Sequence, residues 1–245
     1  MGKMKNKFVV YTALFGDYDK LIDPPKKYDS INFICFTDQK DLKSNIWDIK
    51  IVNSTNKIPN MLNREFKFFP NKYFSEYQYS LYIDSNIRLL SNPITLFEKY
   101  LSNNLIAIPN HWRRNCIYKE AQKCIEIGKV ELEIANRQMQ SYMKEGYPEN
   151  NGLGEMNIIF RKHNDDKIIK LMNDWWNQLN QFSQRDQLSF CYVAWKNSLD
   201  YKFIDESSRR FDKYFFAECH KHDPMYHKIK RFLKKNYYKV KLRWS

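Results

Sequence analysis

Short apolar runs alternate with polar loops through the first half of the chain. Four of these runs, at residues 7–13, 31–36, 47–52 and 79–83, are rich in Val, Ile, Phe and Tyr. Runs of this length and composition predict buried strands. Because a polar loop and a connection follow each run, the pattern predicts an α/β sheet of the nucleotide-binding type, flanked by helices.

The second half of the chain mixes helical and strand patterns. We expect helices at residues 60–74, 93–101, 130–144 and 165–179, and strands at residues 105–109, 155–161 and 199–204, the last of these completing the sheet. Pro93 suits the first turn of a helix, and Gly146 is a helix stop signal. From residue 237 onward, apolar and basic residues alternate, which favours a strand over a helix.

Length and composition indicate one sizeable domain. The chain has 245 residues, 43% of them hydrophobic, and no apolar run long enough to span a bilayer. Its five cysteines are widely scattered and include no CxxC pair. This spacing argues against a zinc knuckle and a disulfide framework, and indicates a reducing compartment. We therefore expect a cytoplasmic protein.

Basic residues are concentrated at the C-terminus. The formal net charge is +13, and residues 228–245 include eight Lys or Arg and no acid. We therefore divide the chain into a domain at residues 1–224 and a basic, aromatic tail at residues 225–245. Such a tail suits an anionic membrane surface or another polyanion, which would make the protein peripheral to the membrane. A solvated terminus would have the same composition.

The stretch YSLYIDSNIRLL, at residues 79–90, contains the first candidate ligand site. Its predicted strand ends in Asp84, Ser85 and Asn86. A carboxylate at the C-terminal end of a buried strand is where α/β proteins place ligand chemistry. An acid followed two residues later by another oxygen ligand can hold a divalent cation that bridges to phosphate. The alternative is an Asx turn without such a role.

Two groups of basic residues are candidates for phosphate or sugar contacts. Arg64 and Lys67 fall on one face of a predicted helix and could reach a diphosphate, or form a solvated face. The sequence His111-Trp112-Arg113-Arg114 follows a predicted strand. His111, Arg113 and Arg114 could contact phosphate or sugar hydroxyls, or the tryptophan could be buried and the charges solvated.

Further candidates lie late in the chain. Asp186 precedes an apolar helix, where it could cap that helix or serve as a base or a sugar-hydroxyl acceptor. Glu155 follows a glycine-rich turn that forms a hairpin or places the acid in a cleft. His220 and His222, two residues apart, favour a metal or phosphate role or lie on the surface.

Several of these pieces occur together in one order. They are YTALFGDYD, CFTD, Arg64 with Lys67, YIDSN, HWRRNCIYKEA, GLGEMNIIFRKH and WWNQLNQFSQRDQLSF, spread over residues 7–192. This order resembles the glycosyltransferase-like domain shared by plant TOD/MUCI-type proteins and bacterial polysaccharide-cluster proteins. The resemblance implies a GT-A-like Rossmann-type mixed sheet in a single domain, distantly similar to the glycogenin and galactosyltransferase group.

In that group the first strand and loop hold the nucleotide, and an Asp-x-Asp step and a late histidine hold manganese. The resemblance therefore implies nucleotide-sugar contacts from Tyr11, Thr12, Asp17, Tyr18, Asp38, Arg64, Lys67 and Asp84. Asp84, Asn86 and His220 match the metal ligands, with His222 as the alternative histidine. Asn86 replaces the second acid and brings no charge, so the cofactor, Mn²⁺ or Mg²⁺, depends on its amide oxygen.

The resemblance implies transfer of a sugar from a nucleotide sugar, with a UDP-sugar as the expected donor, to a hydroxyl of a free or lipid-linked glycan. Asp186 or Glu155 would position or deprotonate the acceptor, or Asp186 would orient the donor. Two alternatives remain: a nucleotidyl- or phosphotransferase using the same acids, and a non-catalytic polyanion-binding protein. The latter explains the charge but not the acids at successive strand ends, and we expect no nucleic-acid partner.

Overall fold

A mixed seven-stranded sheet forms the centre of the fold, with the strand order β3-β2-β1-β4-β7-β6-β8. The computed structural model describes residues 7–53, 58–210 and 212–243. The strands of this sheet are β1 (Phe8–Leu14), β2 (Ile31–Thr37), β3 (Asp48–Ile51), β4 (Tyr79–Ile83), β6 (Ile106–Pro109), β7 (Ile158–Arg161) and β8 (Lys202–Ile204). Strand β7 pairs antiparallel with β4 and β6, and the other pairings in the sheet are parallel.

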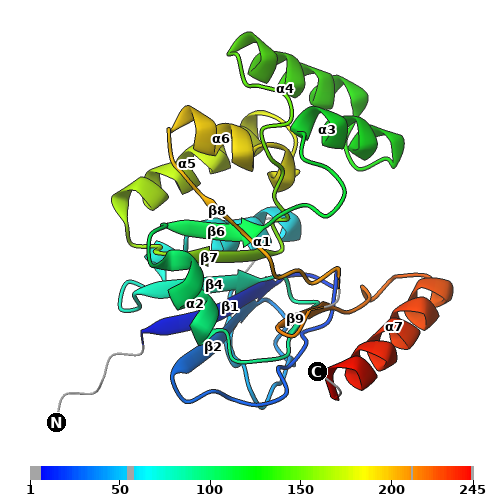
Figure 1. Cartoon of the computed structure of the whole chain (residues 1–245). Coiled ribbons are helices and arrows are strands. Elements are labelled where there is room, and N and C mark those ends of the chain that lie inside the picture. The colour runs from blue at the N-terminus through cyan, green and yellow to red at the C-terminus, as the bar shows by residue number, and fades with distance from the viewer. Residues whose placement is uncertain (1–6, 54–57, 211, 244–245) are drawn as a thin grey trace.

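Helices cover both faces of the sheet (Figure 1). They are α1 (Pro59–Phe68), α2 (Ile94–Leu101), α3 (Ile117–Glu126), α4 (Leu132–Lys144), α5 (Asp166–Gln181), α6 (Phe190–Lys196) and α7 (Met225–Arg243), with the 3₁₀ turns η1 (Pro70–Lys72) and η2 (Asp186–Leu188). Because strand side chains alternate between faces, Val9 and Tyr11 pack in the core with α1 and α5. Phe8 and Val10 pack in the opposite core with α2.

Strand direction brings several loops to one edge of the sheet. The carboxyl ends of β1, β2, β4, β6 and β8 open on that edge, because these strands are parallel to one another. The antiparallel strand β7 begins there, and the amide of Asp84 donates to the carbonyl of Asn157 at 2.9 Å. The loop after β4 therefore lies directly beside the turn that precedes β7.

A small second sheet brings the late part of the chain to the same edge. Strands β5 (Ile87–Leu89) and β9 (Phe215–Ala217) pair antiparallel, with Ile87 opposite Ala217. Asn86 and Glu218 extend this pairing, since the Glu218 amide donates to the Asn86 carbonyl at 2.8 Å. The segment that holds His220 is therefore fixed next to the loop after β4.

The expected architecture, a mixed sheet flanked by helices in a single domain, is confirmed. The four strands predicted in the first half lie where the apolar runs are, and Tyr79–Ile83 has the expected limits. The strand expected at residues 105–109 and the helices expected at 93–101, 130–144 and 165–179 also form, with small shifts of their ends. The division into residues 1–224 and a tail stays a prediction.

Several expected boundaries are wrong. The helix predicted at residues 60–74 ends at Phe68, because Pro70 lacks an amide hydrogen and disfavours helical backbone before it. The strand predicted at 155–161 begins only at Ile158, so Glu155 lies in the preceding turn. Strand β8 begins at Lys202 rather than at residue 199 and is the last strand of the central sheet, and β9 follows it in a second, smaller sheet.

The C-terminal prediction also fails, since residues 225–243 form helix α7 rather than ending in a strand. A strand needs a neighbour to satisfy its backbone groups, whereas a helix satisfies its own. Helix α7 stands apart from the central sheet (Figure 1). Trp244, which belonged to the expected alternation, lies outside the described residues. Among the helices that the structure describes, none is long and apolar enough to cross a membrane.

Buried His163 gives the fold a pH dependence. Its Nε2 lies 2.8 Å from the carbonyl oxygen of Phe74, and burial lowers the pKa of His163 to about 4. The unfolded chain, with an ordinary histidine pKa near 6.5, binds a proton that the fold rejects between about pH 6.5 and 4. Stability is therefore lost as the pH falls through this window.

We predict that acidification from pH 7 to pH 5 lowers the free energy of unfolding by about 2 kcal/mol more in the wild type than in His163→Gln. Urea unfolding at the two pH values measures this difference. His227→Gln, at an exposed histidine, should retain the wild-type pH dependence. Equal dependence in the wild type and His163→Gln would refute the assignment.

Candidate active site

The edge of the sheet where the parallel strands have their carboxyl ends is called the ligand edge here. A buried ion pair lies at its centre. Lys67 Nζ is 2.6 Å from Asp186 Oδ2 and 3.9 Å from Asp84 Oδ1, and the Lys67 side chain is only 6% exposed. The ammonium group also lies 5.0 Å from the centre of the Tyr82 ring. One cation from α1 therefore stands between the acid after β4 and the acid at the start of η2.

Asp186 is held as a carboxylate by this environment. Burial alone would raise the pKa of Asp186, but Lys67, Arg64 and Arg185 outweigh it and keep that pKa below its usual value. Its other oxygen, Oδ1, accepts from the Gln187 amide at 2.9 Å. Asp186 begins η2 and pairs with Lys67, and it does not cap α6, whose N-cap residue is Ser189.

Asp84 faces the solvent side of the edge. It directly follows buried Ile83, and its Oδ1 accepts from the Tyr82 hydroxyl at 3.0 Å. Its side chain is 41% exposed, in contrast to 13% for Asp186. The Asp84 carboxylate is therefore positioned by the protein and exposed to solvent, at the strand end where the sequence placed it, and its ligand role stays a prediction.

His220 joins the site through Asp19, a residue that sequence analysis did not select. His220 Nδ1 lies 2.6 Å from Asp19 Oδ2, and the Asp19 side chain is 3% exposed. The hydrogen bond to Asp19 raises the pKa of His220, and the charges of Asp223 and Asp84 add to this effect. Asp19 is the second acid of the motif GDYD, and nothing in the sequence indicates that its side chain is buried against His220.

This arrangement fits a metal only in part. Metal-ligating histidines commonly bind a carboxylate through their second nitrogen, as His220 does with Asp19, so His220 Nε2 and the Asp84 carboxylate are suitable donors. Asn86 uses its amide nitrogen to donate to the Glu218 carbonyl at 3.2 Å. The described residues contain no cluster of three His, Cys, Asp or Glu side chains that could hold a metal. A metal held by Asp84 and His220 would therefore need further oxygen ligands.

His222 and Lys221 contact the loop after β1 instead. His222 Nε2 lies 3.0 Å from the Asp17 carbonyl oxygen, and Lys221 forms an ion pair with the Asp17 carboxylate. The exposed ring of Tyr18 packs edge-on against His220, with centroids 5.7 Å apart. These contacts tie the first loop to the segment after β9.

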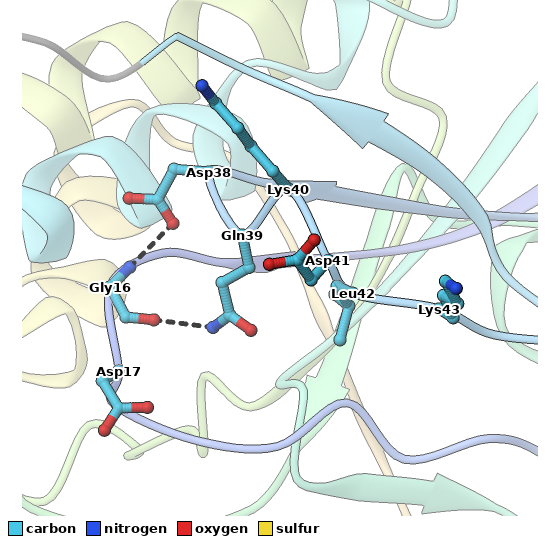
Figure 2. A pocket seen from close by; sticks show the side chains of 8 residues that line it. All are labelled: Gly16, Asp17, Asp38, Gln39, Lys40, Asp41, Leu42 and Lys43. Atoms are coloured by element: carbon cyan, nitrogen blue, oxygen red, sulfur yellow. Dashed lines mark hydrogen bonds between the residues drawn. The ribbon is translucent and has the colours of Figure 1, made fainter.

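A cavity of about 520 Å³ opens beside this first loop. Figure 2 shows the residues that line it, Gly16, Asp17, Asp38, Gln39, Lys40, Asp41, Leu42 and Lys43. Gly16 joins its two walls, donating to Asp38 Oδ1 at 3.0 Å and accepting from Gln39 Nε2 at 2.6 Å. Gly16 has φ +64°, and a Cβ there would lie 3.3 Å from Pro59, so this turn requires glycine.

Two of the predicted nucleotide contacts are corrected by the fold. Tyr11 and Thr12 lie within β1 and are fully buried, so they do not reach the ligand edge. The Tyr11 hydroxyl donates to the Lys67 carbonyl at 3.0 Å and so holds the last turn of α1 against β1. Arg64 and the neighbouring Arg185, which was not predicted, instead place their charges near Asp186.

The remaining candidates form a group beyond β7. Glu155 is 3% exposed, and its Oε1 lies 3.2 Å from Arg209 Nε. Burial raises the pKa of Glu155 against the opposing charges of Arg209 and Arg210. The sequence predicted that Glu155 contacts the acceptor hydroxyl. Because Arg209 covers this buried carboxylate, an acceptor hydroxyl cannot reach it in this structure.

His111, Arg113 and Arg114 organise the loop after β6. The Arg114 amide donates to His111 Nδ1 at 3.0 Å, and the Arg114 side chain bonds to Glu120. Arg113 lies 3.9 Å from the centre of the Trp112 ring. Trp112 is 44% exposed, so the alternative with a buried tryptophan is wrong, while His111 has a structural role in this loop.

Comparison of the sequence with known proteins found a matching family and a curated relative. A sequence profile described as "TOD1/MUCI70, glycosyltransferase-like domain" matches residues 1–227. The chain is 27% identical to the "Probable hexosyltransferase MUCI70" of Arabidopsis thaliana, over 86% of this chain and 42% of that protein. It thus spans less than half the length of that relative.

Solved structures with a similar course of the chain are more distant. Mouse xyloside xylosyltransferase 1 is 11% identical with a TM-score of 0.45, over 81% of this chain and 84% of its own. Galactosyltransferase LgtC, solved with donor and acceptor sugar analogues, is 13% identical with a TM-score of 0.45, over 82% and 74%.

We predict that Asp186→Asn lowers the free energy of unfolding by about 3 kcal/mol, because it leaves the Lys67 ammonium buried without a counter-charge. Combining it with Lys67→Met should recover most of that loss. Urea unfolding at pH 7 measures both effects. Asp84→Asn is the matched control, since Asp84 is more exposed and should cost less than about 1 kcal/mol. Wild-type stability of Asp186→Asn would contradict the role of the ion pair.

Proposed function

Because the chain belongs to the TOD1/MUCI70 family of glycosyltransferase-like domains, we propose that it transfers a hexose from a nucleoside-diphosphate sugar to a hydroxyl group of a glycan. The observation that supports this proposal best is the position of Asp84, Lys67 and Asp186 at one strand edge, next to a cavity large enough for a nucleoside.

The donor would lie along the edge from the first cavity toward Asp84. Asp38 and Asp41, which line the cavity, suit the hydroxyl groups of a ribose, because carboxylates accept hydrogen bonds. The diphosphate would then lie by Asp84 and His220. Arg64 and Arg185, whose charges act on Asp186, would offset the negative charge that develops on the leaving diphosphate. A UDP-sugar is the donor that we propose.

Asp186 would orient the donor sugar. Its lowered pKa makes it a weak base but a stable hydrogen-bond acceptor for sugar hydroxyls. Lys67 would keep this carboxylate in place and add a positive charge close to Asp84. The alternative of a nucleotidyl- or phosphotransferase gains no support from the family, and no observation favours a polyanion-binding protein without activity.

We further propose Mn²⁺ or Mg²⁺ as the cofactor, with Asp84 and His220 Nε2 as protein ligands. A bound divalent ion would supply positive charge to the diphosphate oxygens. Asp19 would fix the His220 ring through Nδ1. Asn86 would hold the Glu218 backbone, and the substrate would supply the remaining oxygen ligands.

We expect Asp84→Asn and His220→Gln each to weaken Mn²⁺ binding in the presence of UDP by about tenfold or more. Both variants should lower turnover of a panel of UDP-sugars by about 10²-fold, the scale of a lost electrostatic contact. Electron paramagnetic resonance measures free Mn²⁺, and release of UDP measures turnover. His222→Gln is the matched control and should behave as the wild type. Unchanged Mn²⁺ affinity and turnover in folded Asp84→Asn would overturn the assignment.

We also propose that α7 docks on an anionic membrane surface, where a lipid-linked acceptor would be concentrated. Five apolar side chains near its start are 54% to 71% exposed: Met225, Tyr226, Ile229, Phe232 and Leu233. Their helical spacing gathers them on one face, with Lys228, Lys230 and Arg231 on the other sides. An amphipathic basic helix of this kind binds in the plane of an anionic interface. The proposal locates the enzyme at the inner, cytoplasmic face of the cell membrane.

We predict that the protein sediments with vesicles containing phosphatidylglycerol at low salt and is released at high salt, because each cation near the surface contributes about 1 kcal/mol. Replacing Ile229, Phe232 and Leu233 together by Ser should abolish sedimentation while sparing turnover of soluble substrates. Leu132→Ser, at an equally exposed residue of α4, is the control and should bind as the wild type. Equal sedimentation of the triple variant and the wild type would refute membrane docking by α7.

A further inference from the structure

A second cavity opens on the ligand edge, on the far side of β7 from the first. It has a volume of about 420 Å³ and is lined by Asn110, Phe203, Ile204, Asp205, Ser207 and Arg210. Strands β6 and β8 end here, and both run parallel to β4. The cavity therefore faces the same side of the molecule as Asp84 and is large enough for a sugar-sized ligand.

A short series of contacts connects this cavity to Asp84. The Asp84 amide donates to the carbonyl of Asn157 at 2.9 Å, and Asn157 Nδ2 donates to the Ser208 hydroxyl at 2.9 Å. Arg209 and Arg210 come directly after Ser208. The second cavity thus adjoins the proposed reaction centre, while the first cavity adjoins it from the β1 and β2 side.

Charged side chains of both signs lie at or near the second cavity, and most of them are paired with one another. Arg209 pairs with buried Glu155, and Arg114 pairs with Glu120. Within the part of the chain that the structure describes, neither Arg210 nor Lys129 has a carboxylate within ion-pair distance.

The one acid in the cavity lining, Asp205, already has partners of its own. The Asp205 carboxylate lies 3.4 Å from Lys99 Nζ and 3.3 Å from the Tyr100 hydroxyl, so its charge is shared with a cation of α2. Arg210 remains as the guanidinium that lines the cavity. A planar guanidinium matches the two oxygens of a carboxylate or phosphate.

We propose that this second cavity binds an anionic group, a carboxylate or a phosphate, of the acceptor glycan. The inference rests on the proposed glycosyl transfer and adds the chemical class of its acceptor. Arg210 would bind the anion, with Asn110 and Ser207 as neutral partners for the hydroxyl groups of the same residue. The donor diphosphate would bind on the other side of β7, beside Asp84, so the two anions would occupy separate places.

The test compares anionic probes with their neutral twins on the full chain loaded with UDP. Saturation-transfer NMR measures the affinities of methyl glucuronide against methyl glucoside, and of glycerol 3-phosphate against glycerol. We expect at least one anionic probe to bind about tenfold more tightly than its twin, as a charge-assisted contact does. Arg210→Gln should remove this preference, and Arg210→Lys should restore part of it. The probe that is preferred identifies the group as carboxylate or phosphate.

Two controls make the result specific. Lys167→Gln removes an exposed cation at the start of α5, after the opposite end of β7, and should leave the preference unchanged. UDP should not displace the anionic probe. Equal binding of an anionic probe and its neutral twin would overturn the inference, as would displacement of the probe by UDP. The same loss of anion preference in Arg210→Gln and Lys167→Gln would also overturn it. Anion binding at Arg210 in a protein that turns over no UDP-sugar would instead refute the proposed transfer while leaving the anion site intact.

Discussion

The buried pair of Lys67 and Asp186 is the interaction on which the candidate site depends. Removing two charges from water is costly, so both must be held close together and hydrogen-bonded. The pair joins α1 to η2 at 2.6 Å across 119 positions of the chain. The Lys67 backbone is fixed as well, because its carbonyl accepts from Tyr11 at 3.0 Å and from buried Arg161 at 2.8 Å. The acids at the edge are therefore positioned by the core beneath them.

The order of strands gives the edge a simple layout. One cavity lies where β1 and β2 end, Asp84 follows β4, and a second cavity lies where β6 and β8 end. Since β7 is antiparallel, its first residues, rather than its last, stand between Asp84 and the second cavity. This arrangement suits a reaction between two substrates that approach Asp84 from opposite sides.

Local sequence patterns predicted those parts of this layout that depend on local structure. The apolar run at Tyr79–Ile83 and the acid after it identified a strand end, and the spacing of Arg64 and Lys67 gave their common helix. The sequence could not show that Tyr11 and Thr12 face inward, because burial on both sides of a parallel sheet removes the alternation of polar and apolar residues. Nor could it show that Asp19 meets His220, since that contact depends on the pairing of β5 with β9.

A crystal structure of the protein with UDP and Mn²⁺ would test directly where the donor and the metal bind. We expect the uridine in the cavity lined by Gly16 and Asp38. We also expect the diphosphate between Asp84 and Arg64, and a manganese anomalous signal beside Asp84 and His220. Electron density for the nucleotide elsewhere on the protein, with no ligand at the edge where β1 and β4 end, would contradict these expectations.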